Sequence, residues 1–335
     1  DGFYGGEFGA GLLALGEGYF AAADLERSQA DWVEPLGLDV WGQRLWTIPP
    51  NSQGYLALAA AWIAEGLPLP DDVDDATWAH LLIEAAVAAG HDRIDVLHDA
   101  ADGTALVAPG RLADRRAAIS TESTSNRWES VPADGGDTTY LCVVDGDRMA
   151  VSLIQSNASG FGSWLVEPAT GINLHNRGLG FSLEPGHPAE YGPGRRPPHT
   201  LSPLLVTNAD GSLSATIGSM GGDGQPQILL QLLARLFGAR RPQSPAEAIA
   251  AGRWVLHGAA TGFDTWAVPG ERGVRIEGQA PASWDSELAT RGHRVSRTPP
   301  FDSGFGHAHV ILADDTGLLA GAADPRAVIG SAAGS

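Results

Sequence analysis

The chain has 335 residues, of which 43% are hydrophobic and 18% charged, a balance typical of globular proteins and not of disordered or fibrous ones. Its 40 acidic residues outnumber the 21 basic ones, giving a formal net charge of −19 at pH 7. Such a charge repels nucleic-acid phosphates and anionic membrane surfaces, so we expect neither as a partner.

The first residues, from Asp1 to Glu7, have the character of mid-domain sequence, with neither an initiator methionine nor a signal-peptide pattern. We therefore expect a fragment or a processed product, and a cytoplasmic and an exported location both stay open. No run in the chain approaches the roughly 20 apolar residues that a membrane helix needs, so we expect no membrane insertion.

Residues 1 to about 130 are predicted to be mainly helical. Gln53–Glu65 is rich in Ala and Leu, and Thr77–Ala89 is similarly Ala-rich; a glycine follows each segment as a natural helix stop. Arg111–Ile119 is a shorter helical candidate. The polar, turn-rich residues Thr121–Gly136 predict an exposed linker.

The linker ends in Gly135 and Gly136, and Asp137 follows it. Two threonines, Thr138 and Thr139, then begin an apolar segment. A Thr hydroxyl is a weak nucleophile, but a Thr that is the first residue of a chain can use its own α-amine as the base. Cleavage between Asp137 and Thr138 would create such a terminus. The alternative is a surface turn followed by an edge strand with a β-branched start.

Beyond Thr138 the chain becomes rich in predicted strands. Three hairpins are expected, each with a turn of small and polar residues between two apolar runs. They are Tyr140–Asp145 with Met149–Ser156, Leu204–Thr207 with Leu213–Gly218, and His307–Leu312 with Leu318–Ala320. Helices are predicted at Gln227–Phe237, from its apolar face, and after the capping box at Ser244–Glu247. Helices followed by antiparallel hairpins predict a layered α+β domain and not a Rossmann alternation.

A glycine-rich turn, Gly218–Gln227, connects a predicted strand to a predicted helix. Gly221 and Gly222 would let backbone N–H groups approach a ligand closely, and the helix start adds unpaired donors. This arrangement suits an oxyanion hole, although a plain structural turn has the same pattern. The turn lacks the lysine and the spacing of a phosphate-binding loop.

The remaining candidate groups indicate no metal site. His199, His307 and His309 lack the spacing of metal ligands with acidic partners. Cys142 is the single cysteine, which excludes an internal disulfide, and its place in a predicted strand favours inert packing.

Several motifs in order along the chain resemble the γ-glutamyltranspeptidase family. The resemblance spans essentially all 335 residues, and upstream of position 138 it matches the second half of that family's large subunit. The motifs are Trp32–Leu36, Pro49–Gly54, Thr138–Asp145, Gly171–Asn176, Leu201–Pro203, Gly221–Gly222 and Ala323–Arg326.

The resemblance implies an αββα four-layer sandwich of the N-terminal nucleophile hydrolase type, made as a precursor that cleaves itself. Residues 1–137 would be the mainly helical C-terminal part of the large subunit, and residues 138–335 the sheet-rich small subunit. Thr138 would be the nucleophile, Ser156 a hydroxyl that contacts it, and Gly221 and Gly222 the oxyanion donors. The resemblance implies acyl transfer from a γ-glutamyl or other acyl amide to water or to an amine or peptide acceptor, with no cofactor.

Departures from the family pattern bear on the substrate. Gly180 stands where a typical member has an Asp that holds the substrate's α-amino group, and His199 and Thr200 stand in place of paired serines. The local sequence is similar to the cephalosporin-acylase-like branch, so glutaryl-like acyl groups are a second possibility. Arg177 is a candidate for binding an acyl carboxylate.

The resemblance also leaves a gap at the front of the chain. The family's large subunit begins with a sizeable portion, carrying a carboxylate-binding Arg, to which nothing in these 335 residues corresponds. A non-catalytic, unprocessed relative that serves as a binding or scaffold protein is the alternative function.

Overall fold

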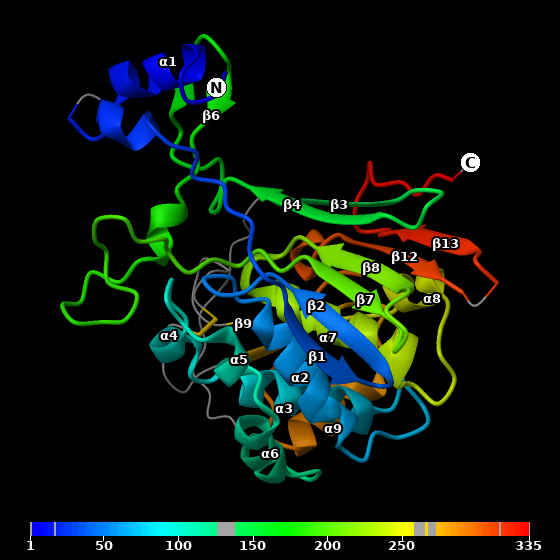
Figure 1. Ribbon diagram of the computed structural model, residues 1–335. Helices are drawn as coiled ribbons and strands as arrows, with labels where there is room; N and C mark the ends of the chain where they lie inside the picture. The colour runs from blue at the N-terminus through cyan, green and yellow to red at the C-terminus, as the bar shows by residue number, and fades with distance from the viewer. Residues whose placement is uncertain are drawn as a thin grey trace.

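The computed structural model describes residues 2–16, 18–125, 138–257, 265–266, 273–314 and 316–334. Its centre is a six-stranded antiparallel sheet with the strand order β1-β2-β7-β8-β12-β13. Helices cover one face of this sheet, and a two-stranded hairpin lies on the other (Figure 1). The strands of the large sheet are β1 (Leu36–Val40), β2 (Gln43–Thr47), β7 (Leu204–Thr207), β8 (Leu213–Ser219), β12 (Ala308–Ala313) and β13 (Leu319–Ala323).

The large sheet joins the two parts of the chain that flank position 138. β2 pairs with β7, so strands from the predominantly helical first part are continuous with strands from the second. The sequence analysis missed β1 and β2. Their side chains alternate between buried and less buried positions, which is a strand signal, but the turn between them is Trp41-Gly42, with φ values of +52° and +72°. Tryptophan is not among the residues that usually indicate such a turn.

Two predicted helices form the layer against the large sheet. α2 (Tyr55–Glu65) lies against β1 and beside α7 (Gln225–Leu233), which continues as a π-helical turn over Ala234–Gly238. α2 is buried on nearly every side, because its many alanines allow close approach from all directions. α3 (Ala76–Gly90) packs outside α2 and begins at Asp75, whose side chain accepts a hydrogen bond from the Thr77 N–H.

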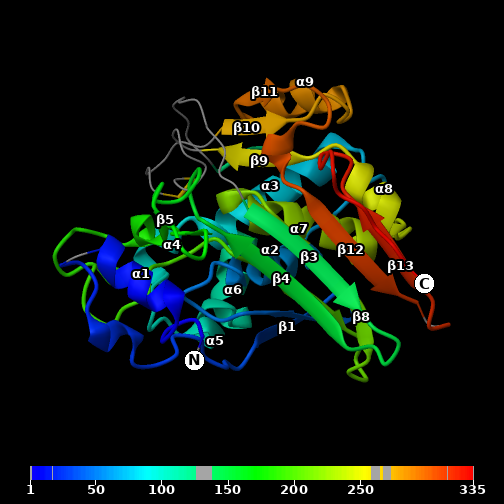
Figure 2. The ribbon, with the colours of Figure 1, turned by 90° about the horizontal axis from the view of Figure 1, so that it is seen from above.

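The hairpin of β3 (Thr138–Val144) and β4 (Ala150–Ser156) packs on β8 and β12, and Figure 2 looks onto it. The inward-facing Tyr140 ring lies over Gly218, where a β-carbon would be only 2.1 Å from the ring. Apolar side chains on the other face of the hairpin are exposed, and no described helix covers them: Leu141, Val143, Val151 and Leu153. Within the described residues, therefore, one helical layer and two sheet layers are present.

The remaining elements surround this core. A smaller sheet has the order β11-β10-β9 and lies beside α9. No described helix has the length and apolar character needed to cross a membrane. The other elements are α1 (Glu7–Leu15), α4 (Arg93–Val96), α5 (Gly103–Leu106), α6 (Pro109–Ala117), β5 (Val166–Glu167), β6 (Ile172–Asn173), α8 (Pro245–Ala250), β9 (Trp254–His257), β10 (Gly273–Ile276), α9 (Ser283–Thr290), β11 (Val295–Arg297) and short 3-10 turns at Ala22–Leu25, Arg177–Gly180, Gly222–Gly224 and Ser303–Phe305.

Candidate active site

Thr138 and Ser156 face each other at the open end of the β3–β4 hairpin. They are register partners, and the Thr138 hydroxyl donates a hydrogen bond to Ser156 Oγ at 2.9 Å. Ser156 Oγ also accepts the Ala158 N–H at 3.0 Å, which holds it beside the threonine. The structure thus brings together the two hydroxyls singled out in the sequence. Asp137, the other half of the predicted cleavage site, lies outside the described residues.

The pair Gly221–Gly222 follows the end of β8. Their φ values, +136° and +53°, lie in the region that favours glycine, which explains why glycine occupies both positions. Tyr140 lies over Gly218, near this end of β8. At the opposite end of the hairpin, Arg148 in the β3–β4 turn donates a hydrogen bond to the carbonyl of Gly317, which lies near the beginning of β8. Thr138 therefore lies at the end of the sandwich where the glycine pair leaves the sheet.

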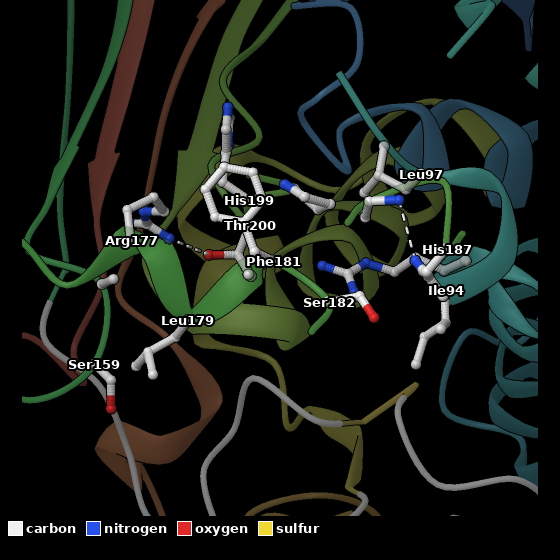
Figure 3. A pocket seen from close by; sticks show the side chains of 15 residues that line it. Ile94, Leu97, Ser159, Arg177, Leu179, Phe181, Ser182, His187, His199 and Thr200 are labelled. Atoms are coloured by element: carbon white, nitrogen blue, oxygen red, sulfur yellow. Dashed lines mark hydrogen bonds between the residues drawn. The ribbon is translucent and has the colours of Figure 1, made fainter. Parts of the chain in front are cut away.

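A pocket of about 230 Å³ gathers all four residues that the sequence analysis assigned to substrate binding, Arg177, Gly180, His199 and Thr200 (Figure 3). The Arg177 guanidinium points toward Thr200 Oγ1, 3.5 Å from Nη1. Thr138, Ser156, Gly221 and Gly222 do not line this pocket, but Ala158 and Ser159 do. The chain that leaves Ser156 thus forms part of its wall.

Gln53, which the sequence analysis placed at a helix start, links the pocket to the glycine turn. Its buried side chain donates from Nε2 to the carbonyls of Gly222, at 3.1 Å, and Thr200, at 3.3 Å. The backbone before it pairs with the pocket segment, since Gln53 N–H donates to the His199 carbonyl and His199 N–H to the Asn51 carbonyl. The conspicuous Pro-Pro-Asn-Ser-Gln-Gly segment therefore positions both halves of the site. The available signal in the sequence was the motif Pro49–Gly54, which carried part of the family resemblance.

Positive charge dominates the pocket wall of this acidic protein. Arg93 and Arg177 both line it, and no Asp or Glu of the described residues does. Arg93 Nε and Arg177 Nη2 are buried without hydrogen-bond partners among the described residues. Arg93 Nη2 lies 3.5 Å from Asp223, which follows Gly222. The pKa of His199 is lowered to about 4, mainly by burial and then by the charges of Arg177 and Arg93. This imidazole is therefore neutral near pH 7.

Gly180 has a steric role that the sequence did not reveal. A β-carbon at this position would lie 2.2 Å from the Pro198 carbonyl oxygen, so any side chain would require the backbone to move. An aspartate could not simply replace this glycine.

Known proteins are similar to this chain in sequence and in fold. Residues 1–334 match the family described as Gamma-glutamyltranspeptidase. The chain is 36% identical to the oxamate amidohydrolase proenzyme of Klebsiella pneumoniae, covering 100% of this chain and 62% of that protein, and 34% identical to the glutathione hydrolase-like YwrD proenzyme of Bacillus subtilis, covering 92% and 57%. The crystal structure of cephalosporin acylase from Bacillus halodurans superposes with a TM-score of 0.84 at 32% identity, covering 97% of this chain and 58% of that one.

The chain thus spans about three-fifths of the length of these relatives. Cephalosporin acylase is an N-terminal nucleophile hydrolase, so the α+β sandwich predicted from the sequence is confirmed. The resemblance to the family and to its cephalosporin-acylase-like branch is confirmed as well.

Proposed function

Since the chain belongs to the gamma-glutamyltranspeptidase family, we propose that it is part of an autoprocessing amidohydrolase or acyltransferase whose nucleophile is Thr138. One observation carries the proposal. Thr138 is the first residue of β3, its hydroxyl is bonded to Ser156, and it lies at the same end of the sandwich as Gly221–Gly222. A nucleophile, a supporting hydroxyl and a pair of backbone N–H donors are the groups that acyl transfer needs.

In this mechanism the bond before Thr138 is cut first, which frees the α-amine. That amine accepts the hydroxyl proton while Thr138 Oγ1 attacks the amide carbonyl of the substrate. The N–H groups of Gly221 and Gly222 stabilise the oxyanion, and the Gln53 bond to the Gly222 carbonyl holds the Gly222–Asp223 peptide that directly follows these donors. The amine returns the proton to the leaving nitrogen. Water or an amine acceptor then releases the acyl group from Thr138.

N-terminal sequencing of the mature protein tests the cleavage step. We expect a denaturing gel to show two fragments, the C-terminal one beginning at Thr138, because only cleavage there converts the threonine amide nitrogen into a base. One intact band in enzyme given time to mature would favour the non-catalytic, scaffold-like relative instead. A C-terminal fragment that begins elsewhere would assign the nucleophile to another residue.

For the substrate, we propose an amide whose acyl part carries a carboxylate. Arg93 and Arg177 line the same pocket, and each has a buried donor nitrogen without a hydrogen-bond partner among the described residues. Guanidinium groups bind carboxylates with two parallel hydrogen bonds. The relative from Klebsiella pneumoniae is named for oxamate, itself an amide with a carboxylate. Because backbone fills the space beside Gly180, we propose that this pocket lacks an ammonium site and that glutaryl-like amides react better than γ-glutamyl ones.

Replacing Arg177 by Gln tests this subsite. A hydrogen bond to a charged group contributes about 1.5–3 kcal/mol, so we expect kcat/KM for a glutaryl anilide to fall by about 10- to 100-fold. The valeryl anilide, which lacks the carboxylate, should change little. Arg240→Gln, at an exposed arginine, is the matched control. Equal losses on both anilides, or better turnover of γ-glutamyl than of glutaryl anilide by the unmodified enzyme, would contradict the assignment.

A further inference from the structure

Three buried side chains outside the candidate active site converge on one point: His80, Glu84 and His293. One potential ligand atom from each lies within 4.8 Å of the others, and this is the one such group of His, Cys, Asp and Glu among the residues that the structure describes. His80 and Glu84 are four residues apart on α3, so both project from the same face of the helix. All three are almost completely inaccessible to solvent.

Local structure brings His293 to this face. α9 packs against α3 (Figure 1) and ends where Gly292 adopts a φ of +91°. The His293 N–H then reaches back to the Leu288 carbonyl at 3.0 Å, the hydrogen bond that closes a helix of this kind. The glycine turn therefore directs the His293 ring inward to α3.

A hydrogen bond to the backbone orients the His80 imidazole as a ligand. His80 Nε2 lies 2.9 Å from the Ser120 carbonyl, which can only accept a hydrogen bond, so the ring proton is on Nε2 and the lone pair is on Nδ1. A backbone carbonyl commonly orients a metal-bound histidine in this way. That Nδ1 accepts a hydrogen bond from His293 Nε2–H at 2.7 Å, and the two rings are inclined by 67°. To bind an ion through Nε2, the His293 ring must carry its proton on Nδ1 instead, where no hydrogen-bond partner is found among the described residues.

The surroundings of Glu84 also favour a bound cation. Hydrogen bonds come to its carboxylate from Thr124 Oγ1, at 2.6 Å, and from the backbone and hydroxyl of Ser125, at 3.0 and 2.7 Å. No described Arg or Lys makes an ion pair with it; the one basic group within 4.0 Å is the His293 imidazole. Buried carboxylates are generally paired with a cation or bound to a metal, because desolvating a lone charge is costly.

Two imidazole nitrogens and one carboxylate oxygen form a ligand set that suits zinc, with a fourth position for a further ligand. We propose that His80, Glu84 and His293 bind a divalent metal ion of the zinc class. The ion would neutralise Glu84 and connect α3 to the segment after α9. Because Ser120 bonds His80 and the residues after it bond Glu84, the ion would also stabilise the segment after α6. The site is independent of Thr138 and of the amidohydrolase assignment.

Elemental analysis and cobalt substitution of the intact protein, expressed from its complete gene, test the site. We expect about one equivalent of zinc after purification and, after exchange with Co²⁺, a visible absorption band typical of nitrogen and oxygen ligands. Glu84→Gln and His80→Gln should each weaken metal binding at least about 100-fold, since even outer-shell changes cost 10- to 100-fold. His91→Gln, at an exposed histidine just beyond the end of α3, is the matched control and should keep the ion.

Two results would overturn the proposal. In the first, the protein binds neither zinc nor cobalt, and the trio is then a hydrogen-bonded network alone. In the second, the metal binds equally well in Glu84→Gln and His80→Gln, so it lies elsewhere. If these variants do not fold, X-ray absorption of the zinc-loaded wild-type protein decides instead: scattering from two imidazoles supports the site, and its absence refutes it.

Discussion

Replacing Thr138 by Ala is expected to leave the precursor uncut and to reduce amide hydrolysis by about 10⁴-fold or more, because the variant lacks both the hydroxyl that attacks and the amine released by cleavage. Purified precursor would be incubated, its fragments sequenced, and its turnover of a glutaryl anilide measured. Thr138→Ser keeps both groups and should still process, although more slowly. The effect is the largest that we expect from one substitution.

Thr139 offers a matched control for that experiment. It has the same side chain one position along β3 and points to the solvent-exposed side of the hairpin, opposite Gln155. Thr139→Ala should process and should stay within about tenfold of wild-type activity, since surface substitutions usually change stability by less than about 0.5 kcal/mol. A Thr138→Ala protein that is still cut before position 138, or that remains active, would refute the proposed mechanism.

Replacing Asp324 by Ala should have the largest effect on stability. The carboxylate is buried between two arginines, with Arg253 Nη2 at 2.7 Å and Arg326 Nη1 at 3.0 Å. It also accepts the Ala308 N–H at 2.8 Å, which ties the start of β12 to the end of β13. Burial alone would raise the pKa of Asp324, but the two guanidinium charges hold it below its ordinary value.

Removing one partner from a buried ion pair costs about 3–5 kcal/mol, because the remaining charge is left unpaired. We therefore expect Asp324→Ala to lower the free energy of unfolding by about that amount, measured by denaturant titration. Asp39→Ala, which breaks the exposed Asp39–Arg44 pair, should cost less than about 1 kcal/mol. A loss below about 1 kcal/mol at Asp324 would show that Glu277, bonded to Arg326, compensates for it.

The same network explains the closing motif of the chain. Ala323-Asp324-Pro325-Arg326 supported the family resemblance, and in the structure its two charged residues are buried among Arg253 and Glu277. The motif thus stabilises the end of the large sheet. Nothing in the sequence alone shows which of several charged motifs is buried in this way and which lies on the surface.

Local patterns along the chain were sufficient to predict α2, α3, α7 and the three hairpins after Thr138. Each is determined by side chains a few residues apart: helical periodicity, a terminal glycine, or two apolar runs around a short turn. The same patterns drew attention to Thr138 and to the Gly221–Gly222 turn. The roles of these residues came from resemblance, since a hydroxyl or a glycine has no single function by itself.

Other features depended on residues far apart in the chain, and only the tertiary structure revealed them. The pairing of β2 with β7 joins the two parts of the chain, and Gln53 bridges Thr200 and Gly222 across more than a hundred residues. Arg93 reaches the pocket from α4, and His293 meets α3 from beyond α9. Burial and charge pairing decide what such residues do, and both depend on packing between segments, which local periodicity does not encode.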